Sequence, residues 1–124
     1  MKTILLIEDN DIMRENTIEL LELSNYKVVS TDNGINGLQL IAESNPDLII
    51  CDINLPGLSG IEVYKRFLDR HDAGKVPFIF LSASSQALEN DAGIKPDAFV
   101  GKPYSAEDLL SAIEGCFSHV TAHK

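Results

Sequence analysis

Short apolar runs alternate along the chain with segments whose apolar residues recur at helical spacing. The runs are rich in Ile, Val, Leu and Phe and are apolar along most of their length, which is typical of strands buried on both faces of a sheet. We predict five strands: Thr3–Ile7, Lys27–Thr31, Leu48–Asp52, Phe78–Ser82 and Ala98–Gly101.

The first segment with helical spacing spans Asp11–Leu23 and begins four residues after the end of the first strand. Either Asn10 or Asp11 can cap it, because short polar side chains accept hydrogen bonds from the free N–H groups of a first turn. One face of the predicted helix carries Met13, Thr17, Leu20 and Leu21.

Two more helices are predicted between the second and fourth strands. Residues 35–43 form the first, which ends ahead of Pro46 because proline pushes the residue before it out of the helical region. Residues 60–69 form the second.

The last helix has the clearest start signal in the chain. Ser105 and Asp108 have the spacing of a capping box and precede an apolar stripe, and we expect this helix to end near His119. Between residues 84 and 97, only residues 87–91 have a helical pattern, so a helix there is expected to be short.

Strands that alternate with helices predict a doubly wound α/β fold, with a five-stranded parallel sheet and helices on both faces. The common strand order for this architecture is 2-1-3-4-5. The 124 residues, 44% of them apolar, suffice for one domain spanning residues 1–124 and leave no room for a second.

Charge narrows the range of partners. Ten Lys and Arg against nineteen Asp and Glu give a formal net charge of -9, which repels nucleic acid and anionic membrane surfaces. The N-terminal apolar run is too short for a signal peptide or a membrane span, so we expect a cytoplasmic protein without direct nucleic-acid or membrane partners. Cys51 and Cys116 match no metal or redox spacing and are predicted to be structural.

Polar residues gather where the predicted strands end. Glu8 and Asp9 follow the first strand, Asp52 ends the third, Ser82 ends the fourth and Lys102 follows the fifth. Open α/β sheets bind ligands beyond the carboxyl ends of their strands, and the order 2-1-3-4-5 makes the first and third strands neighbours. Three carboxylates then share one crevice, which favours a hard divalent cation such as Mg²⁺.

A phosphoryl-transfer site explains these residue types. A carboxylate can attack phosphorus and form an acyl phosphate, and such catalysis consists mainly of positioning and of stabilising charge on the phosphoryl oxygens. Lys102 can bind one of these oxygens and the Ser82 hydroxyl can donate to another. Asp52 is the candidate nucleophile.

Three segments resemble the receiver domains of response regulators, and the resemblance covers essentially the whole chain. They are the acidic pair in Ile7-Glu8-Asp9-Asn10, the loop Asp52-Ile53-Asn54-Leu55-Pro56-Gly57 and the signature Lys102-Pro103-Tyr104. The family resemblance implies a phosphorylation-switched module of two-component signalling. Its partners would be a sensor histidine kinase or a phosphotransfer protein, and it would catalyse its own phosphorylation and dephosphorylation without being a metabolic enzyme.

The resemblance also implies roles for individual residues. Asp52 would be the phosphoacceptor, and Asp9, Asp52 and the backbone carbonyl of Asn54 would bind Mg²⁺ or another divalent cation such as Mn²⁺. Glu8 would act through a metal-bound water, and the Lys102-Pro103 peptide would be cis. Ser82 and Phe99 would be the switch residues.

Other functions for the same fold fit the sequence less well. A flavodoxin-like carrier would need a loop that binds an anionic cofactor phosphate, whereas this chain places Glu8 and Asp9 there. A phosphatase with an aspartyl nucleophile would need a second acid two positions after Asp52, where Asn54 stands. A scaffold that is never phosphorylated would not need this set of polar residues. The sequence names neither the kinase nor the output partner, and it leaves open whether the domain acts alone or within a longer regulator.

Overall fold

A computed structural model describes residues 1–70, 73–83 and 97–122. Its strands form one parallel sheet in the order β2-β1-β3-β4-β5, as the sequence predicts. All five strands have the predicted bounds: β1 Thr3–Ile7, β2 Lys27–Thr31, β3 Leu48–Asp52, β4 Phe78–Ser82 and β5 Ala98–Gly101.

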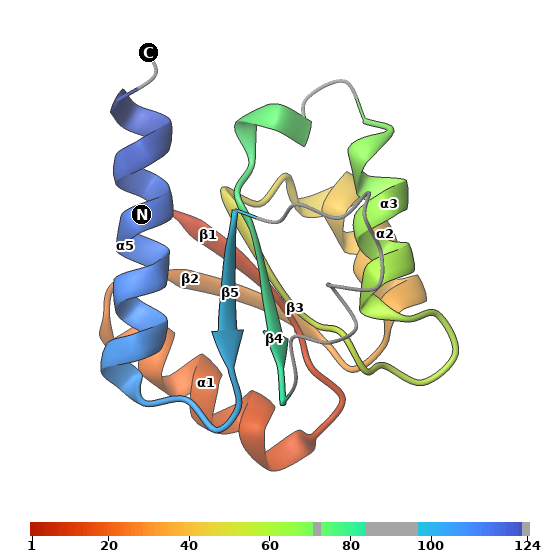
Figure 1. The fold of residues 1–124 in the computed structure, drawn as a ribbon, viewed down its shortest axis with the longest axis horizontal. Coiled ribbons are helices and arrows are strands. Elements are labelled where there is room, and N and C mark those ends of the chain that lie inside the picture. The colour runs from red at the N-terminus through yellow and green to blue at the C-terminus, as the bar shows by residue number, and fades with distance from the viewer. Residues whose placement is uncertain (71–72, 84–96, 123–124) are drawn as a thin grey trace.

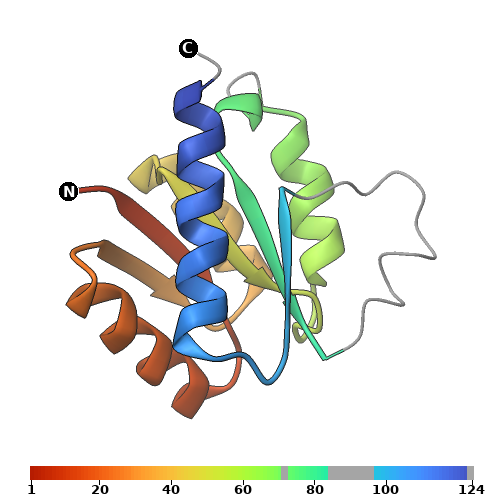
Figure 2. The same ribbon diagram turned by 60° about the vertical axis from the view of Figure 1, so that its left-hand side comes forward.

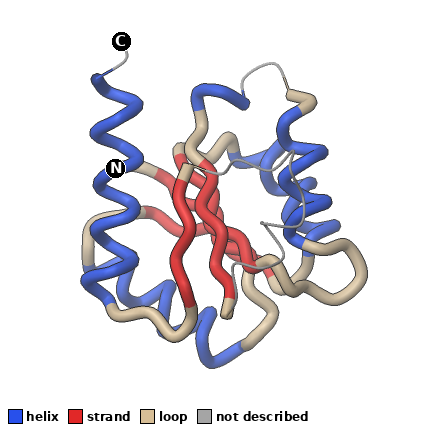
Figure 3. The backbone as a smooth tube through the Cα atoms, in the orientation of Figure 1, coloured by secondary structure: helices blue, strands red, loops and turns tan. Residues whose placement is uncertain are grey.

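Helices cover both faces of the sheet, which lies between them as a central layer (Figures 1 and 3). Helices α1 (Asp11–Leu23) and α5 (Ala106–Ala122) lie on one face, as Figure 2 shows from the side. Helices α2 (Gly34–Ser44) and α3 (Gly60–Leu68) lie on the other face, and a short 3-10 helix, η1 (Ala73–Lys75), follows α3. Within the described residues, no helix is both long and apolar enough to cross a membrane.

The core consists of two apolar clusters separated by the sheet. Alternate residues of a strand point to opposite faces, so Leu5 and Ile7 of β1 join one cluster while Ile4 and Leu6 join the other. The three central strands are buried on both sides, which accounts for their unbroken apolar sequences. Cys51 and Cys116 are buried, free thiols, in line with their predicted structural role.

Helix starts agree closely with the sequence signals. Asn10 caps α1, accepting a hydrogen bond from the Met13 amide at 2.9 Å, and this resolves the choice between Asn10 and Asp11. In α5 the predicted capping box is present: the Ser105 hydroxyl accepts a hydrogen bond from the Asp108 amide at 3.0 Å.

Helix ends agree less closely. Helix α2 is one residue longer at each end than predicted, because Asn33 caps it and Asn45 ends it in a left-handed conformation ahead of Pro46. Helix α3 ends one residue earlier than predicted and α5 continues to Ala122. The helix predicted for residues 87–91 lies outside the described residues.

The sheet register brings the carboxyl ends of the strands to one edge. Ile7 of β1 is paired with Cys51 of β3, and the next residue of β3, Asp52, is paired with Leu81 of β4. Ser82 is paired with Gly101, so Lys102 follows at the same edge. This register places the predicted functional residues together.

Gly60, the first residue of α3, lies directly behind this edge. Its amide donates to the Ile53 carbonyl at 2.9 Å, and a Cβ atom at this position would overlap the Asp52 carbonyl oxygen and lie 2.8 Å from Ile53 Cα. Since these are backbone atoms, no side-chain rotation relieves the overlap. A glycine is therefore required for α3 to approach the end of β3 this closely.

We predict that Gly60→Ala lowers the free energy of unfolding by about 2 to 3 kcal/mol, since overpacking against backbone forces the chain apart. Urea denaturation measures the change. Gly115→Ala is the matched control: a Cβ there meets no atom within 4 Å, and alanine in a helix should be neutral or stabilising by up to about 1 kcal/mol. Equal stabilities of the two variants would contradict the packing argument.

Candidate functional site

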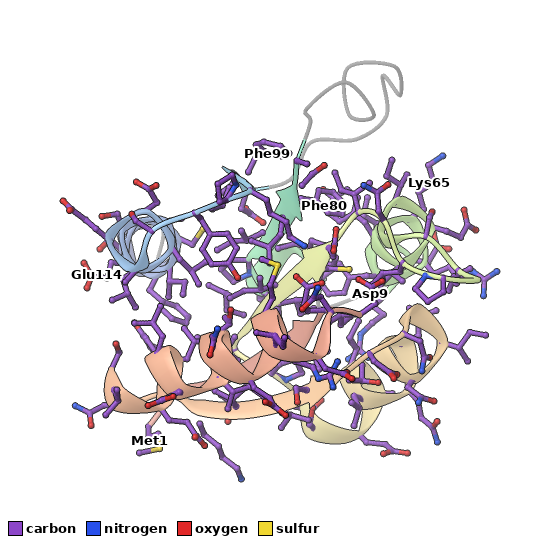
Figure 4. All side chains as sticks on the ribbon, turned by 90° about the horizontal axis from the view of Figure 1, so that it is seen from below. Met1, Asp9, Lys65, Phe80, Phe99 and Glu114 are labelled. Carbon is purple, nitrogen blue, oxygen red and sulfur yellow. The ribbon has the colours of Figure 1, made fainter. Side chains whose placement is uncertain are left out.

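Three carboxylates meet at the carboxyl ends of β1 and β3. Glu8 and Asp9 follow β1 and Asp52 is the last residue of β3. Each offers an oxygen atom within 4.8 Å of the others, while Glu8 and Asp52 are buried and Asp9 is exposed. Figure 4 views the molecule from this side and labels Asp9. The clustering predicted from the strand order is confirmed.

Lys102 links the two buried carboxylates. Its ammonium nitrogen lies 2.6 Å from Glu8 Oε1 and 2.7 Å from Asp52 Oδ2, so it donates a charge-assisted hydrogen bond to each. The backbone holds the base of this side chain, because the Lys102 amide donates to the Ser82 carbonyl at 2.8 Å. The predicted cis peptide between Lys102 and Pro103 is present.

The pKa values at the site follow from burial and from these contacts. Burial raises the pKa of Glu8 above its usual value, and Asp52 raises it further, while the hydrogen bond from Lys102 lowers it. Burial alone would lower the pKa of Lys102, but the hydrogen bonds and charges of Asp52 and Glu8 together raise it. Lys102 is therefore cationic at neutral pH and partly offsets the charge of the carboxylates.

The donor set fits a small, hard divalent cation. Such ions prefer oxygen ligands, and Mg²⁺ keeps several waters in its shell. Glu8, Asp9 and Asp52 supply carboxylate oxygens at one place, and the exposure of Asp9 leaves room for water on that side. Asn54 is exposed, and its backbone amide donates to Asp52 Oδ1 at 3.0 Å, so the loop after β3 supplies a hydrogen bond to the carboxylate.

The predicted switch residues lie at and near the same edge. Ser82 is buried at the end of β4, the strand next to that of Asp52. Phe99 of β5 is paired in register with Phe80 of β4 and is partly buried against the cluster that contains Phe80. In Figure 4, Phe80 lies in the interior and Phe99 farther out.

Arg14, for which the sequence predicted no role, holds the segment that carries Glu8. Arg14 Nη1 donates to the Glu8 carbonyl at 2.9 Å, and Nη2 forms a 2.6 Å ion pair with Asp11, an exposed acid. An arginine three residues after an acid in a helix is a recognisable pairing signal. The contact with the Glu8 carbonyl has no such signal.

A second unpredicted contact joins segments that are distant in sequence. The Tyr104 hydroxyl lies 2.7 Å from Thr17 Oγ1 on α1. Both residues lie on the α1 and α5 side of the core, where Thr17 is buried and Tyr104 is partly buried. This hydrogen bond forms only in the tertiary fold, so no local sequence pattern predicts it.

Comparisons with a family model, with curated proteins and with solved structures all point to the same family. The chain matches the response regulator receiver domain over residues 4–114. It is 31% identical over 115 residues to the polar-differentiation response regulator DivK of Brucella anthropi, covering 91% of this chain and 94% of DivK.

Solved structures of similar fold include a putative response regulator from Chloroflexus aurantiacus. It has a TM-score of 0.85 and 25% identity, covering 92% of this chain and 95% of that one. Another is the receiver domain of the sensor histidine kinase PA1611 from Pseudomonas aeruginosa, with a magnesium ion coordinated in its active site cleft. It has a TM-score of 0.84 and 23% identity, covering 91% of this chain and 94% of that one. At this identity the likeness is one of fold.

We predict that Lys102→Met lowers the free energy of unfolding by about 2 to 3 kcal/mol at neutral pH without divalent cations, because two buried carboxylates then lack their cation. The deficit should shrink in mild acid. A carboxyl group whose pKa is raised in the folded protein costs stability above that pKa, and protonation of Glu8 removes the cost.

Urea denaturation at neutral and mildly acidic pH measures this difference. Lys75→Met, at an exposed lysine, is the control and should change stability little at either pH. A Lys102→Met deficit that is the same at both pH values would argue against the pairing with Glu8.

Proposed function

The chain belongs to the response regulator receiver domain family, and from this premise we propose that it is a cytoplasmic switch that is phosphorylated on Asp52. Receiver domains of this family act in two-component signalling and are phosphorylated by histidine kinases. The donor here would be a histidine kinase or a phosphotransfer protein. The observation that carries the proposal is the Asp52 carboxylate at the end of a buried strand, hydrogen-bonded to Lys102 and beside two further acids.

The reaction begins with attack by an Asp52 carboxylate oxygen on the phosphorus atom. A bond from this oxygen to phosphorus forms while the bond from phosphorus to the donor histidine nitrogen breaks, and the histidine keeps the electron pair. Both Asp52 oxygens already have partners, Lys102 Nζ on Oδ2 and the Asn54 amide on Oδ1. These hydrogen bonds support the proposal because they orient the carboxylate before the donor arrives.

Lys102 and Ser82 would bind the transferred phosphoryl group. The ammonium group of Lys102 already lies next to Asp52, so a phosphoryl group on Asp52 would fall within its reach. Ser82 ends the neighbouring strand and would donate to a second phosphoryl oxygen. Water later attacks the acyl phosphate and releases inorganic phosphate, so the domain catalyses its own reset but is no metabolic enzyme.

We further propose that Glu8, Asp9, Asp52 and the Asn54 carbonyl hold Mg²⁺, or another divalent cation such as Mn²⁺. When bound, the ion would offset the negative charge of the phosphoryl oxygens during transfer. The acidic cluster supports this assignment, as does the magnesium ion reported for the PA1611 receiver domain. Asp9 and Asp52 would be direct ligands, and Glu8 would act through a water.

The switch would run from Ser82 to Phe99. Hydrogen bonding of Ser82 to a phosphoryl group would draw the end of β4 toward Asp52, and Phe99 of the adjacent strand would repack in response. The pairing of Phe80 with Phe99 and of Ser82 with Gly101 supports this route, since it places both residues on one strand pair.

Asp52→Asn should abolish phosphorylation. Incubation of the unmutated protein with acetyl phosphate and Mg²⁺ should add one phosphoryl group, detected by intact-mass spectrometry, because the acceptor must be a carboxylate. Asp69→Asn, at an exposed acid that follows α3, is the control and should label normally. Labelling of the Asp52→Asn protein to the same extent as the control would refute the assignment.

Asp9→Ala should weaken Mg²⁺ binding by about tenfold or more, since it removes a direct ligand. Glu8→Ala should weaken it less, because its contact is through water. Isothermal titration calorimetry gives the affinities. Asp11→Ala is the control for general negative charge, as Asp11 is close in sequence but pairs with Arg14. If Asp9→Ala and Asp11→Ala bind Mg²⁺ equally well, the ligand assignment is wrong.

A further inference from the structure

The link between β5 and α5 carries Lys102 and is anchored at both of its ends. At one end the Lys102 amide donates to the Ser82 carbonyl at 2.8 Å. At the other end Ser105 caps α5 through the Asp108 amide. Tyr104 lies between these anchors, partly buried against the apolar cluster under α1 and α5.

The Tyr104 hydroxyl ties the middle of this link to α1. Its oxygen lies 2.7 Å from Thr17 Oγ1, across 87 residues of sequence, and Thr17 is buried with 4% of its surface exposed. Helix α1 begins at Asp11, two residues after Asp9, and Arg14 fastens it to the Glu8 carbonyl. The hydrogen bond therefore joins the link that carries Lys102 to the helix that follows Glu8 and Asp9.

The contacts of the Lys102 ammonium group depend closely on where this group lies. Its two contacts, at 2.6 and 2.7 Å, are both short, and a hydrogen bond weakens once donor and acceptor separate beyond about 3.2 Å. A movement of the link away from α1 by about 1 Å would therefore break at least one of them unless the side chain rearranged. A long lysine side chain does not fix its own ammonium group, so any contact that holds the backbone of the link also limits where this group can lie.

We propose that Tyr104 is a positioning residue for Lys102. Its hydrogen bond to Thr17 holds the link against α1 and thereby holds the ammonium group between Glu8 and Asp52. This inference rests on the proposed phosphorylation of Asp52 and extends it to a residue that does not touch the phosphoryl group. Burial raises the pKa of Tyr104, so the hydroxyl keeps its proton at neutral pH.

The first test compares phosphorylation rates with acetyl phosphate and Mg²⁺. Tyr104→Phe removes only the hydroxyl and should slow labelling about threefold to tenfold, as expected for one lost hydrogen bond. Thr17→Val should slow it similarly, and the double variant should be no slower than either, because all three lose the same bond. Tyr26→Phe, a partly buried tyrosine that contacts Phe117 and packs in the same cluster, is the matched control and should label normally.

A second comparison separates positioning from a general structural role. In a Lys102→Met background, Tyr104→Phe should cause no further slowing, since the residue acts through Lys102. The same fold loss in both backgrounds would overturn the inference. Urea denaturation of each variant confirms that the proteins compared are folded.

A third measurement does not depend on phosphorylation. Nitrogen-15 NMR without Mg²⁺ or phosphodonor follows exchange of the Lys102 ammonium protons with water, which Tyr104→Phe should accelerate and Tyr26→Phe should not. Unchanged exchange in Tyr104→Phe would overturn the positioning role. Accelerated exchange in a protein that acetyl phosphate never labels would support positioning while rejecting the proposed function.

Discussion

The site depends on one electrostatic constraint, the enclosure of negative charge at the edge of the sheet. Glu8 and Asp52 are both buried, and without a cation their mutual repulsion and lost hydration would oppose folding. Lys102 meets both at hydrogen-bond distance. The parallel register, the close approach of α3 at Gly60 and the contact of Tyr104 with Thr17 all bear on this ion triad, since each helps to fix where one of its members lies.

The sequence was enough to predict the strands of the sheet and the residues of the acidic cluster. All five strands could be predicted because each is a short apolar run ended by polar or turn-forming residues. Strand order then brought Glu8, Asp9 and Asp52 together, since the first and third strands are neighbours. The starts of α1 and α5 were predictable from their caps, Asn10 and Ser105, whereas the start of α2, capped by Asn33, was placed one residue late. Helix ends were less predictable, because they carry weaker local signals.

Finer features of the site had no sequence signal. Glu8 and Asp9 are adjacent acids, yet one is enclosed and the other exposed, because successive residues leaving a strand point in different directions. The double contact of Lys102 and the hydrogen bond of Tyr104 depend on side chains that meet only in the folded protein. Because these residues are far apart along the chain, no local sequence pattern predicts that they pair.

The separation of the triad along the chain also has a consequence for how the protein folds. Lys102 is 94 residues from Glu8 and 50 from Asp52, so these contacts close some of the longest loops in the chain. Contacts between residues so far apart in sequence raise the contact order and carry a loop-closure entropy, which slows their formation. Until β5 pairs with β4, a growing or partly folded chain has its carboxylates but lacks their cation. Completion of the sheet therefore also completes the site, because Lys102 reaches Glu8 and Asp52 only when β5 is in place.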